Sequence, residues 1–377
     1  MASHARHFSS LKRSHGSSTV VTEQSNYKTK AIQVENEIRD ELRSAFFTDT
    51  PGFLDTFFPG LDDKITDILT KLDDSLWLKF PDSSDKNRKE KSYYSPFVDL
   101  ANAVHVACGK DLRPSRWLPD PHRSPPSYDT KAADLQPDII AALGVPDTPK
   151  DTSAKSSVPT KVPWHRILVP MEVKKGDVEK AAALQLFTYI RQVFHESVDR
   201  RFVFGLVLAD RNITIYLADR SGVLGSTSFN MHDVRHHFLY GTLSNQFSLT
   251  QDRRSLVHLI AGFSLIDIDR LGWDTTMTVV HKSMKGNPLL SYEIQFQDDG
   301  HLQWYSEYFW RMVVHGIQPD GNVKEEAFIL FHHLSLSRGE VILGRATRVW
   351  KAWREEDMNL PPQQRQVRPL LQYLGCI

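Results

Sequence analysis

The sequence predicts an α+β protein in which a domain that mixes helices and strands precedes a β-rich segment. Before residue 270, stretches with apolar residues at helical spacing are interleaved with short apolar runs typical of strands. From residue 271 to 353 the chain carries almost only strand-like patterns. We therefore divide it into an α+β domain over 31–270 and a β-rich segment over 271–353. Residues 1–30 hold few large apolar side chains and are expected to be disordered, and residues 354–377 are expected to be irregular.

Composition and charge narrow the class of protein. The chain holds 46 Lys and Arg against 46 Asp and Glu, so no overall positive charge favours nucleic acid. Cys108 and Cys376 are too few for a disulfide framework or a cysteine zinc site, which fits a reducing compartment. No apolar run is long enough to span a bilayer, and the N-terminus lacks the apolar core of a secretory signal. We expect an intracellular protein, cytoplasmic or nuclear and not secreted, with no membrane partner.

Apolar residues recur at helical spacing in several stretches: residues 31–47, 61–72, 94–108, 177–196 and 231–263. Pro96 suits the first turn of the third of these helices, and Gly109 suits its end. Asp177 is a good N-cap for the fourth helix. This fourth helix is apolar on more than one face, so we expect it to be largely buried.

Short apolar runs predict the strands of the first domain. Residues 135–144 form one such run, and residues 165–174 form another, which ends in Glu172-Val173-Lys174. Because residues i and i+2 of a strand point to the same face, Glu172 and Lys174 are expected to lie side by side.

A hairpin is predicted over residues 200–219. A near-continuous apolar run comes first, a turn follows at 210–212, and an alternating run comes last. A continuous run suits a central strand that is buried on both faces, whereas an alternating run suits an edge strand. We therefore expect the second strand of the hairpin at the edge of the sheet.

The order of these elements resembles the core of the PD-(D/E)XK nuclease superfamily over residues 94–220. A helix is followed by a strand that starts at Pro137-Asp138, a long loop, the strand that ends in Glu172-Val173-Lys174, a buried helix and a further strand. The separation between the two acids is longer than the pattern usually has, and a Pro-, Ser- and Lys-rich insertion over 145–163 accounts for it. The resemblance implies a nuclease-like core, which is a mixed sheet flanked by helices.

The same resemblance implies a metal-dependent site for the cleavage of nucleic acid. Asp138 and Glu172 would be the ligands of a Mg²⁺ ion, and Lys174 would orient the attacking water or meet the charge of the transition state. Gln185 matches a glutamine often found near such sites, and Asp99 is the candidate for the acid that the first helix often adds. Two other interpretations remain: Glu172 and Lys174 form an ordinary ion pair worth about 0–1 kcal/mol, or the fold persists as a binding module without activity.

A second resemblance rests on the β-rich segment and its junction with the first domain. The stretch VILGRATRVWKAW aligns with the glycine-rich loop of protein kinases, with Gly344 at the middle glycine and Ile342 and Thr347 at the other two glycine positions. This stretch and the phrases DRRFVFGLVLADRNITIYLADRSGVLGS and HLIAGFSLIDIDRLGWDTTM come in the order typical of the fungal-type protein kinase family. The chain resembles this family over about residues 90–355, with the nuclease-like fold as the region upstream of the kinase.

The kinase resemblance implies the start of a kinase N-lobe without its catalytic residues. Phosphoryl transfer needs a lysine on the third strand of the lobe, the aspartate of an H-R-D motif and the metal-binding aspartate of a D-F-G motif. No lysine follows Lys351 and neither motif follows Gly344, so the chain reads as a truncated member in which ATP binding is not expected. We expect a non-catalytic regulatory or interaction module with protein partners. The alternative is a Mg²⁺-dependent nuclease that acts on nucleic acid through Asp138, Glu172 and Lys174.

Overall fold

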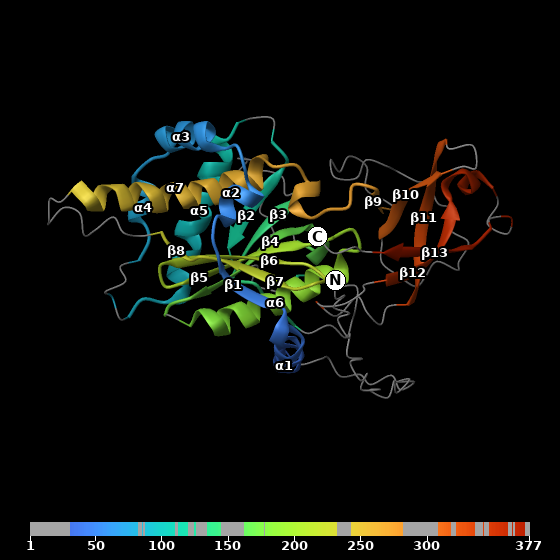
Figure 1. Cartoon of the computed structure of the whole chain (residues 1–377), viewed down its shortest axis with the longest axis horizontal. Coiled ribbons are helices and arrows are strands. Elements are labelled where there is room, and N and C mark those ends of the chain that lie inside the picture. Colours follow the sequence, from blue (N-terminus) through green and yellow to red (C-terminus); the bar gives the residue numbers. More distant parts are fainter. Residues whose placement is uncertain are drawn as a thin grey trace, which may run out of the picture.

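The computed structural model confirms the α+β class. A mixed sheet flanked by helices is followed by a separate antiparallel sheet (Figure 1). The structure describes residues 31–81, 85, 87–109, 112–119, 124–125, 134–144, 162–176, 178–231, 243–281, 308–317, 322–335, 342, 347–360, 364 and 366–373. The tail over 1–30, the N-cap Asp177 and the loop glycine Gly344 lie outside the described residues.

The first sheet has eight strands, in the order β1-β7-β6-β5-β4-β3-β2, with β8 paired to β6 beside this path. The strands are β1 Phe46–Thr50, β2 Ser115–Pro119, β3 Ile139–Leu143, β4 Ile167–Lys174, β5 Val203–Ala209, β6 Asn212–Ala218, β7 Val223–Ser226 and β8 Phe229–Asn230. The pairs β4–β5 and β1–β7 are parallel, and the other pairs are antiparallel. A parallel pair needs a crossover connection, which the helix α6 provides between β4 and β5.

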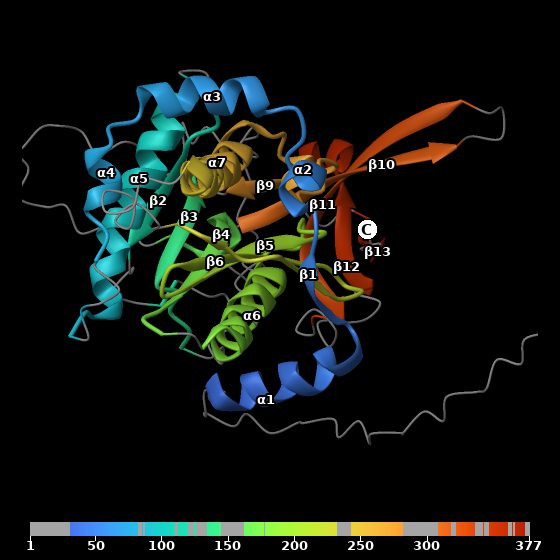
Figure 2. The ribbon, with the colours of Figure 1, turned by 60° about the vertical axis from the view of Figure 1, so that its left-hand side comes forward.

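Helices cover both faces of this sheet. They are α1 Ala31–Glu41, η1 Leu42–Ser44, α2 Phe53–Phe57, α3 Asp62–Lys71, α4 Ser75–Leu78, η2 Glu90–Tyr93, α5 Tyr94–Ala107, η3 Trp164–Arg166, α6 Glu179–Glu196, α7 Leu243–Leu265 and η5 Asp269–Leu271. Figures 1 and 2 show α6 and α1 on one face and α3, α5 and α7 on the other. Within the described part of the chain, none of the helices combines the length and the apolar character needed to cross a bilayer.

Each face of the first sheet carries its own apolar core. The α6-side core joins residues of α1 and α6, such as Ile38 and Ile190, to Val207 of the sheet. The α7-side core joins Leu259 of α7 to Ile215 and other residues of the opposite sheet face. Because both faces are covered, most strand residues in the centre of the sheet are buried whatever their direction.

Gly205 lets α6 lie close to β5. A Cβ atom on Gly205 would lie 3.0 Å from Cδ1 of Ile190 and 3.0 Å from both Cδ atoms of Leu186. A glycine inside a strand often marks such a close approach. The helix therefore packs directly on the sheet, where its polar side chains can reach the end of β4.

The prediction that the second strand of the hairpin forms an edge is wrong. β6 lies between β5 and β7, and every side chain from Ile213 to Ala218 is buried. The pattern alternates because two polar side chains face α6 and bind there: the hydroxyls of Thr214 and Tyr216 donate to Glu179 Oε1 at 2.7 and 3.0 Å. Buried polar side chains with a partner thus give the same alternation as an exposed face.

The second sheet has five antiparallel strands in the order β13-β12-β11-β10-β9. They are β9 Met277–His281, β10 Tyr308–Ile317, β11 Val323–Ser335, β12 Thr347–Arg354 and β13 Arg368–Tyr373. β13 and the 3-10 helix η6 (Glu355–Asn359) lie in the segment that was expected to be irregular, so this expectation is wrong for them. β13 forms because it pairs with β12 along its whole length.

Candidate functional site

Glu172 and Lys174 lie at the end of β4, near the centre of the first sheet. The side chain of Glu172 is completely buried, and that of Lys174 is 22 % exposed to solvent. Lys174 Nζ donates to Glu172 Oε1, so the two charges lie side by side on one face of the strand. A buried carboxyl group is thereby paired with an ammonium group that still reaches the surface.

Asp138 joins the start of β3 to β4. Its backbone N–H donates to the carbonyl of Met171 at 3.1 Å, and the backbone N–H of Val173 donates to Asp138 Oδ2 at 2.8 Å. The hydroxyl of Tyr94, at the start of α5, donates to the other carboxylate oxygen, Oδ1. Asp138 therefore faces the same strand end as Glu172 and is held there from two sides.

Gln185 reaches this site through a residue that the sequence did not single out. Its Nε2 donates to the hydroxyl oxygen of Tyr189 at 2.8 Å, and this hydroxyl lies 2.8 Å from Glu172 Oε2 and 3.0 Å from the carbonyl of Gln136. Residues i and i+4 of a helix are neighbours on its surface. That spacing from Gln185 is the signal that could have identified Tyr189.

Asp99 is not part of this cluster. Its side chain is half-exposed on α5, and its partner is Lys79, whose Nζ lies 3.4 Å from Asp99 Oδ2. The acid that does reach the site is Glu90 of η2, with Oε2 at 4.0 Å from Lys174 Nζ. Glu90 comes one turn before α5, so a search that extended to the residues just ahead of the helix could have found it.

Burial controls the proton affinity of Glu172. Removal from water raises the pKa of its carboxyl group to about 7, and the negative charge of Asp138 acts in the same direction. The hydrogen bonds from Lys174 and Tyr189 oppose this rise and only partly offset it. Burial is the largest single influence on Lys174 and lowers its pKa, but the hydrogen bond to Glu172 together with the negative charges of Glu172, Glu90 and Asp138 raises it above the usual value. Lys174 therefore stays charged, and Glu172 is the group that titrates near neutral pH.

The hydrogen-bond geometry also favours a proton on Glu172. Tyr189 has one O–H to donate, yet Glu172 Oε2 and the carbonyl of Gln136 both lie within reach. An ionised Glu172 leaves one of these two acceptors without that hydrogen. A protonated Glu172 can donate to the oxygen of Tyr189, which then donates to Gln136, and both acceptors are satisfied.

The cluster lacks the set of available oxygen ligands that a divalent cation needs. Within the described residues, no three His, Cys, Asp or Glu side chains are grouped so as to hold a metal ion. Each of the four carboxyl oxygens of Asp138 and Glu172 is already hydrogen-bonded within the chain. The ammonium group of Lys174 supplies the positive charge that a cation would bring. This arrangement does not fit a bound Mg²⁺ ion, so no chemical step through such an ion follows from it.

Two residues of the predicted glycine-rich loop, Ile342 and Thr347, belong to the described part of the chain. Thr347 begins β12, and Ile342 is completely buried in the α6-side core. The backbone N–H of Ile342 donates to Glu41 Oε2 of α1 at 3.0 Å. This part of the β-rich segment therefore contacts the first domain.

The fold and the site together define a two-part α+β protein, with a charged cluster at the end of β4 in its first sheet and a separate antiparallel second sheet. The family model described as fungal protein kinase matches residues 147–363, which is more than half of the chain and includes strands of both sheets. The chain belongs to the fungal protein kinase family. No curated protein and no solved structure matches it.

Proposed function

We propose that this chain is a non-catalytic regulatory or interaction module of the fungal protein kinase family, in which the first domain holds the kinase-like sheet in place. The observation that carries the proposal is an exchange of apolar side chains. Val198 of the first domain lies in the core of the second sheet, and Ile342 from the β-rich segment lies in the α6-side core. Each part thus completes the core of the other.

The junction around Val198 supports a fixed arrangement. Arg200 pairs with Trp273 in an isolated β-bridge, and its guanidinium carbon lies 3.3 Å from the centroid of the Trp273 ring. The backbone N–H of Asp274 donates to the carbonyl of Asp199 at 2.7 Å. Gly272, with φ of +103°, is required in this turn because a Cβ there would lie 2.1 Å from the carbonyl oxygen of Phe202.

The contact at Ile342 supports a regulatory role. Ile342 stands at the first glycine position of the loop that covers the nucleotide phosphates in a kinase. Here it is buried in the α6-side core, and its N–H donates to Glu41 of α1. Burial lowers the pKa of Arg220, and the charge of Glu41 partly opposes this. A loop anchored in this way is restrained from closing over a nucleotide.

The residues available for phosphoryl transfer point in the same direction. β12 is the strand that follows Gly344, and β13 pairs with it. The sequence of β13, RPLLQY, contains no lysine. No lysine follows Lys351 in the sequence, and neither an H-R-D nor a D-F-G motif follows Gly344. Within these residues, the lysine and the two aspartates that bind phosphates and metal in a kinase are therefore not found.

The second candidate function is a Mg²⁺-dependent nuclease. The observation in its favour is that Asp138, Glu172 and Lys174 converge at one strand end with Glu90 nearby. Against it, Lys174 already neutralises the buried carboxyl group, and the carboxylate oxygens are bonded to the chain. We rank this function second for that reason.

The first proposal, a non-catalytic regulatory or interaction module, is tested by measurements on the full chain. Phosphoryl transfer to a generic peptide and Mg·ATP binding are measured for the wild type and for Ile342→Glu, with Val323→Glu, a change at a surface position, as the control. We expect no transfer in any of the three, and a single cooperative unfolding transition that broadens or splits only in Ile342→Glu. Transfer by the wild type, or an unchanged transition in Ile342→Glu, would contradict the proposal.

The nuclease function is tested by calorimetry with Mg²⁺ and Mn²⁺ on the wild type and on Glu172→Ala. Metal binding that is lost in the variant, together with cleavage of DNA or RNA, would establish the second candidate. The absence of binding in both proteins is the result that the structure leads us to expect.

A further inference from the structure

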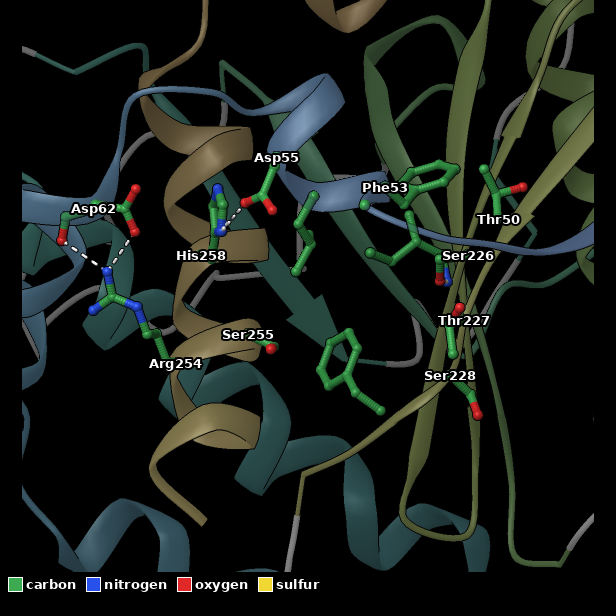
Figure 3. A pocket seen from close by; sticks show the side chains of 14 residues that line it. Thr50, Phe53, Asp55, Asp62, Ser226, Thr227, Ser228, Arg254, Ser255 and His258 are labelled. Carbon is green, nitrogen blue, oxygen red and sulfur yellow. Dashed lines mark hydrogen bonds and ion pairs between the residues drawn. The ribbon is translucent and has the colours of Figure 1, made fainter. Parts of the chain in front are cut away.

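A pocket of about 580 Å³ opens on the α7 side of the first sheet, away from the buried charges on the α6 side. Figure 3 shows two polar walls facing each other. Arg254, Ser255 and His258 project from α7, and Thr50, Ser226, Thr227 and Ser228 come from the ends of β1 and β7. Apolar side chains complete the lining: Phe53, Leu54, Ile215 and Phe229. The volume lies within the range of small-molecule sites.

The basic groups of this pocket are already engaged within the chain. Arg254 Nη2 donates to Asp62 Oδ1 at 2.5 Å, and its Nη1 donates to Thr66 Oγ1 at 3.0 Å. His258 Nε2 lies 2.7 Å from the carbonyl of Phe58, to which it donates, so in the neutral ring Nδ1 is an acceptor. No cation among these lining residues is left to bind a phosphate or a carboxylate.

Two exposed acidic side chains line the pocket, and because Asp62 is bonded to Arg254, Asp55 is the one that is accessible to a ligand. The carboxylate of Asp55 is 85 % exposed, and its contact with His258 Nδ1 is long, at 4.0 Å. A carboxylate can accept two hydrogen bonds from neighbouring hydroxyl groups of one molecule. The hydroxyl side chains on the opposite wall can donate as well as accept, and the apolar side chains offer contact to the C–H face of a ring.

We propose that this pocket binds a small uncharged ring compound with vicinal hydroxyl groups, the chemistry that sugars and nucleosides share. Asp55 would accept the hydrogen bonds of the vicinal pair, the hydroxyl wall would bind the remaining polar atoms, and Phe53 and Phe229 would contact the ring. This function is separate from the proposed regulatory role, because none of the lining residues belongs to the Glu172 cluster or to the contact of Ile342.

The walls are held in position without a ligand. Ser226 Oγ accepts the backbone N–H of Ile215 at 3.0 Å, which fixes the strand wall to β6. On the other side α7 packs tightly on α2, because Gly262 lies against the ring of Phe58. A pocket that is already formed avoids the ordering that binding would otherwise require.

The test is a titration of the full chain, followed by calorimetry and by ligand-observed NMR, with D-glucose, adenosine and inorganic phosphate as separate probes. We expect glucose or adenosine to bind and phosphate not to bind, and the comparison of the first two identifies the source of the ring. Asp55→Asn should weaken binding about tenfold, since hydrogen bonds to a charged group are stronger than those to a neutral one.

Asp67→Asn is the matched control, because Asp67 is also exposed, at 60 %, and lies outside the pocket in an ion pair with Lys71. Its affinity for the ring compound should equal that of the wild type. Binding of phosphate in place of the ring compounds, binding of none of the probes, or equal affinity in Asp55→Asn would overturn the proposal. Loss of metal binding or of the Ile342 contact would leave this result unaffected, so the two proposals fail independently.

Discussion

Replacement of Glu172 by glutamine should remove a pH dependence from the stability of the protein. The unfolded chain ionises this carboxyl group at its usual pKa of 4.5, whereas burial raises the pKa in the folded protein to about 7. Between these two values the native state holds a proton that the unfolded chain has released. The free energy of unfolding contributed by this group is therefore fully present below pH 4.5 and is lost as the pH rises through about 7.

The size of the effect follows from the two pKa values. A rise from 4.5 to about 7 corresponds to about 3 kcal/mol in the free energy of unfolding. About 2–3 kcal/mol of this difference falls between pH 5 and pH 8. Glutamine has nearly the same shape and no ionisable group, so Glu172→Gln should lack this term, while titrating groups that do not interact with Glu172 contribute equally to both proteins.

The assay is urea unfolding of the wild type and of Glu172→Gln at pH 5, 6, 7 and 8. We expect the stability of the wild type relative to the variant to fall by about 2–3 kcal/mol across this range. Glu356→Gln is the control, because the side chain of Glu356 is 72 % exposed. Parallel pH curves for the wild type and Glu172→Gln would show that the carboxyl group ionises as it does in water, and would refute the reasoning from burial.

Three further changes test the packing at the Glu172 cluster, beside the pocket and at the junction of the two parts of the chain. Tyr189→Phe removes the hydroxyl bonded to Glu172 and should cost about 2 kcal/mol at pH 8 and less at pH 5; an equal loss of urea stability at both values would contradict this. Gly262→Ala places a Cβ 2.5 Å from the ring of Phe58 and should lower the stability by about 1–3 kcal/mol, although alanine has the better helix propensity. A raised melting temperature would contradict this expectation. Gly272→Ala should be still more damaging, because φ is +103° and the added Cβ meets a backbone oxygen at 2.1 Å, and near-wild-type thermal unfolding would contradict that expectation.

The strand that carries Glu172 was predictable because its signals are local. An apolar run marks β4, and the two-residue repeat of a strand places Glu172 beside Lys174. The helix α6 was equally evident from its apolar spacing, and Gln185 lies on it near the site. What the spacing could not provide is the intermediate role of Tyr189, which depends on how the helix is rotated over the sheet.

The choice between Asp99 and Glu90 shows where such reasoning ends. Glu90 begins η2, just before α5, and Asp99 lies within α5, and both side chains carry a carboxyl group. Only the packing of η2 beside β4 brings Glu90 to Lys174, while Asp99 points to Lys79. Which acid lies at the site depends on contacts between segments far apart in the sequence, and a local sequence pattern does not contain them.

The sequence alone determined the family, the α+β class and the strongest periodic elements, because period, turn chemistry and characteristic phrases are properties of neighbouring residues. The tertiary structure alone decided the rest. β1, β2 and β13 are short strands that exist through pairing with β7, β3 and β12. The central position of β6 depends on Glu179, which accepts hydrogen bonds from the buried hydroxyls of this strand. The burial of Ile342 depends on the first domain, where its bonding partner Glu41 lies 301 residues earlier in the chain. In each case the free energy comes from contacts between distant segments, and such contacts leave no periodic trace in the chain.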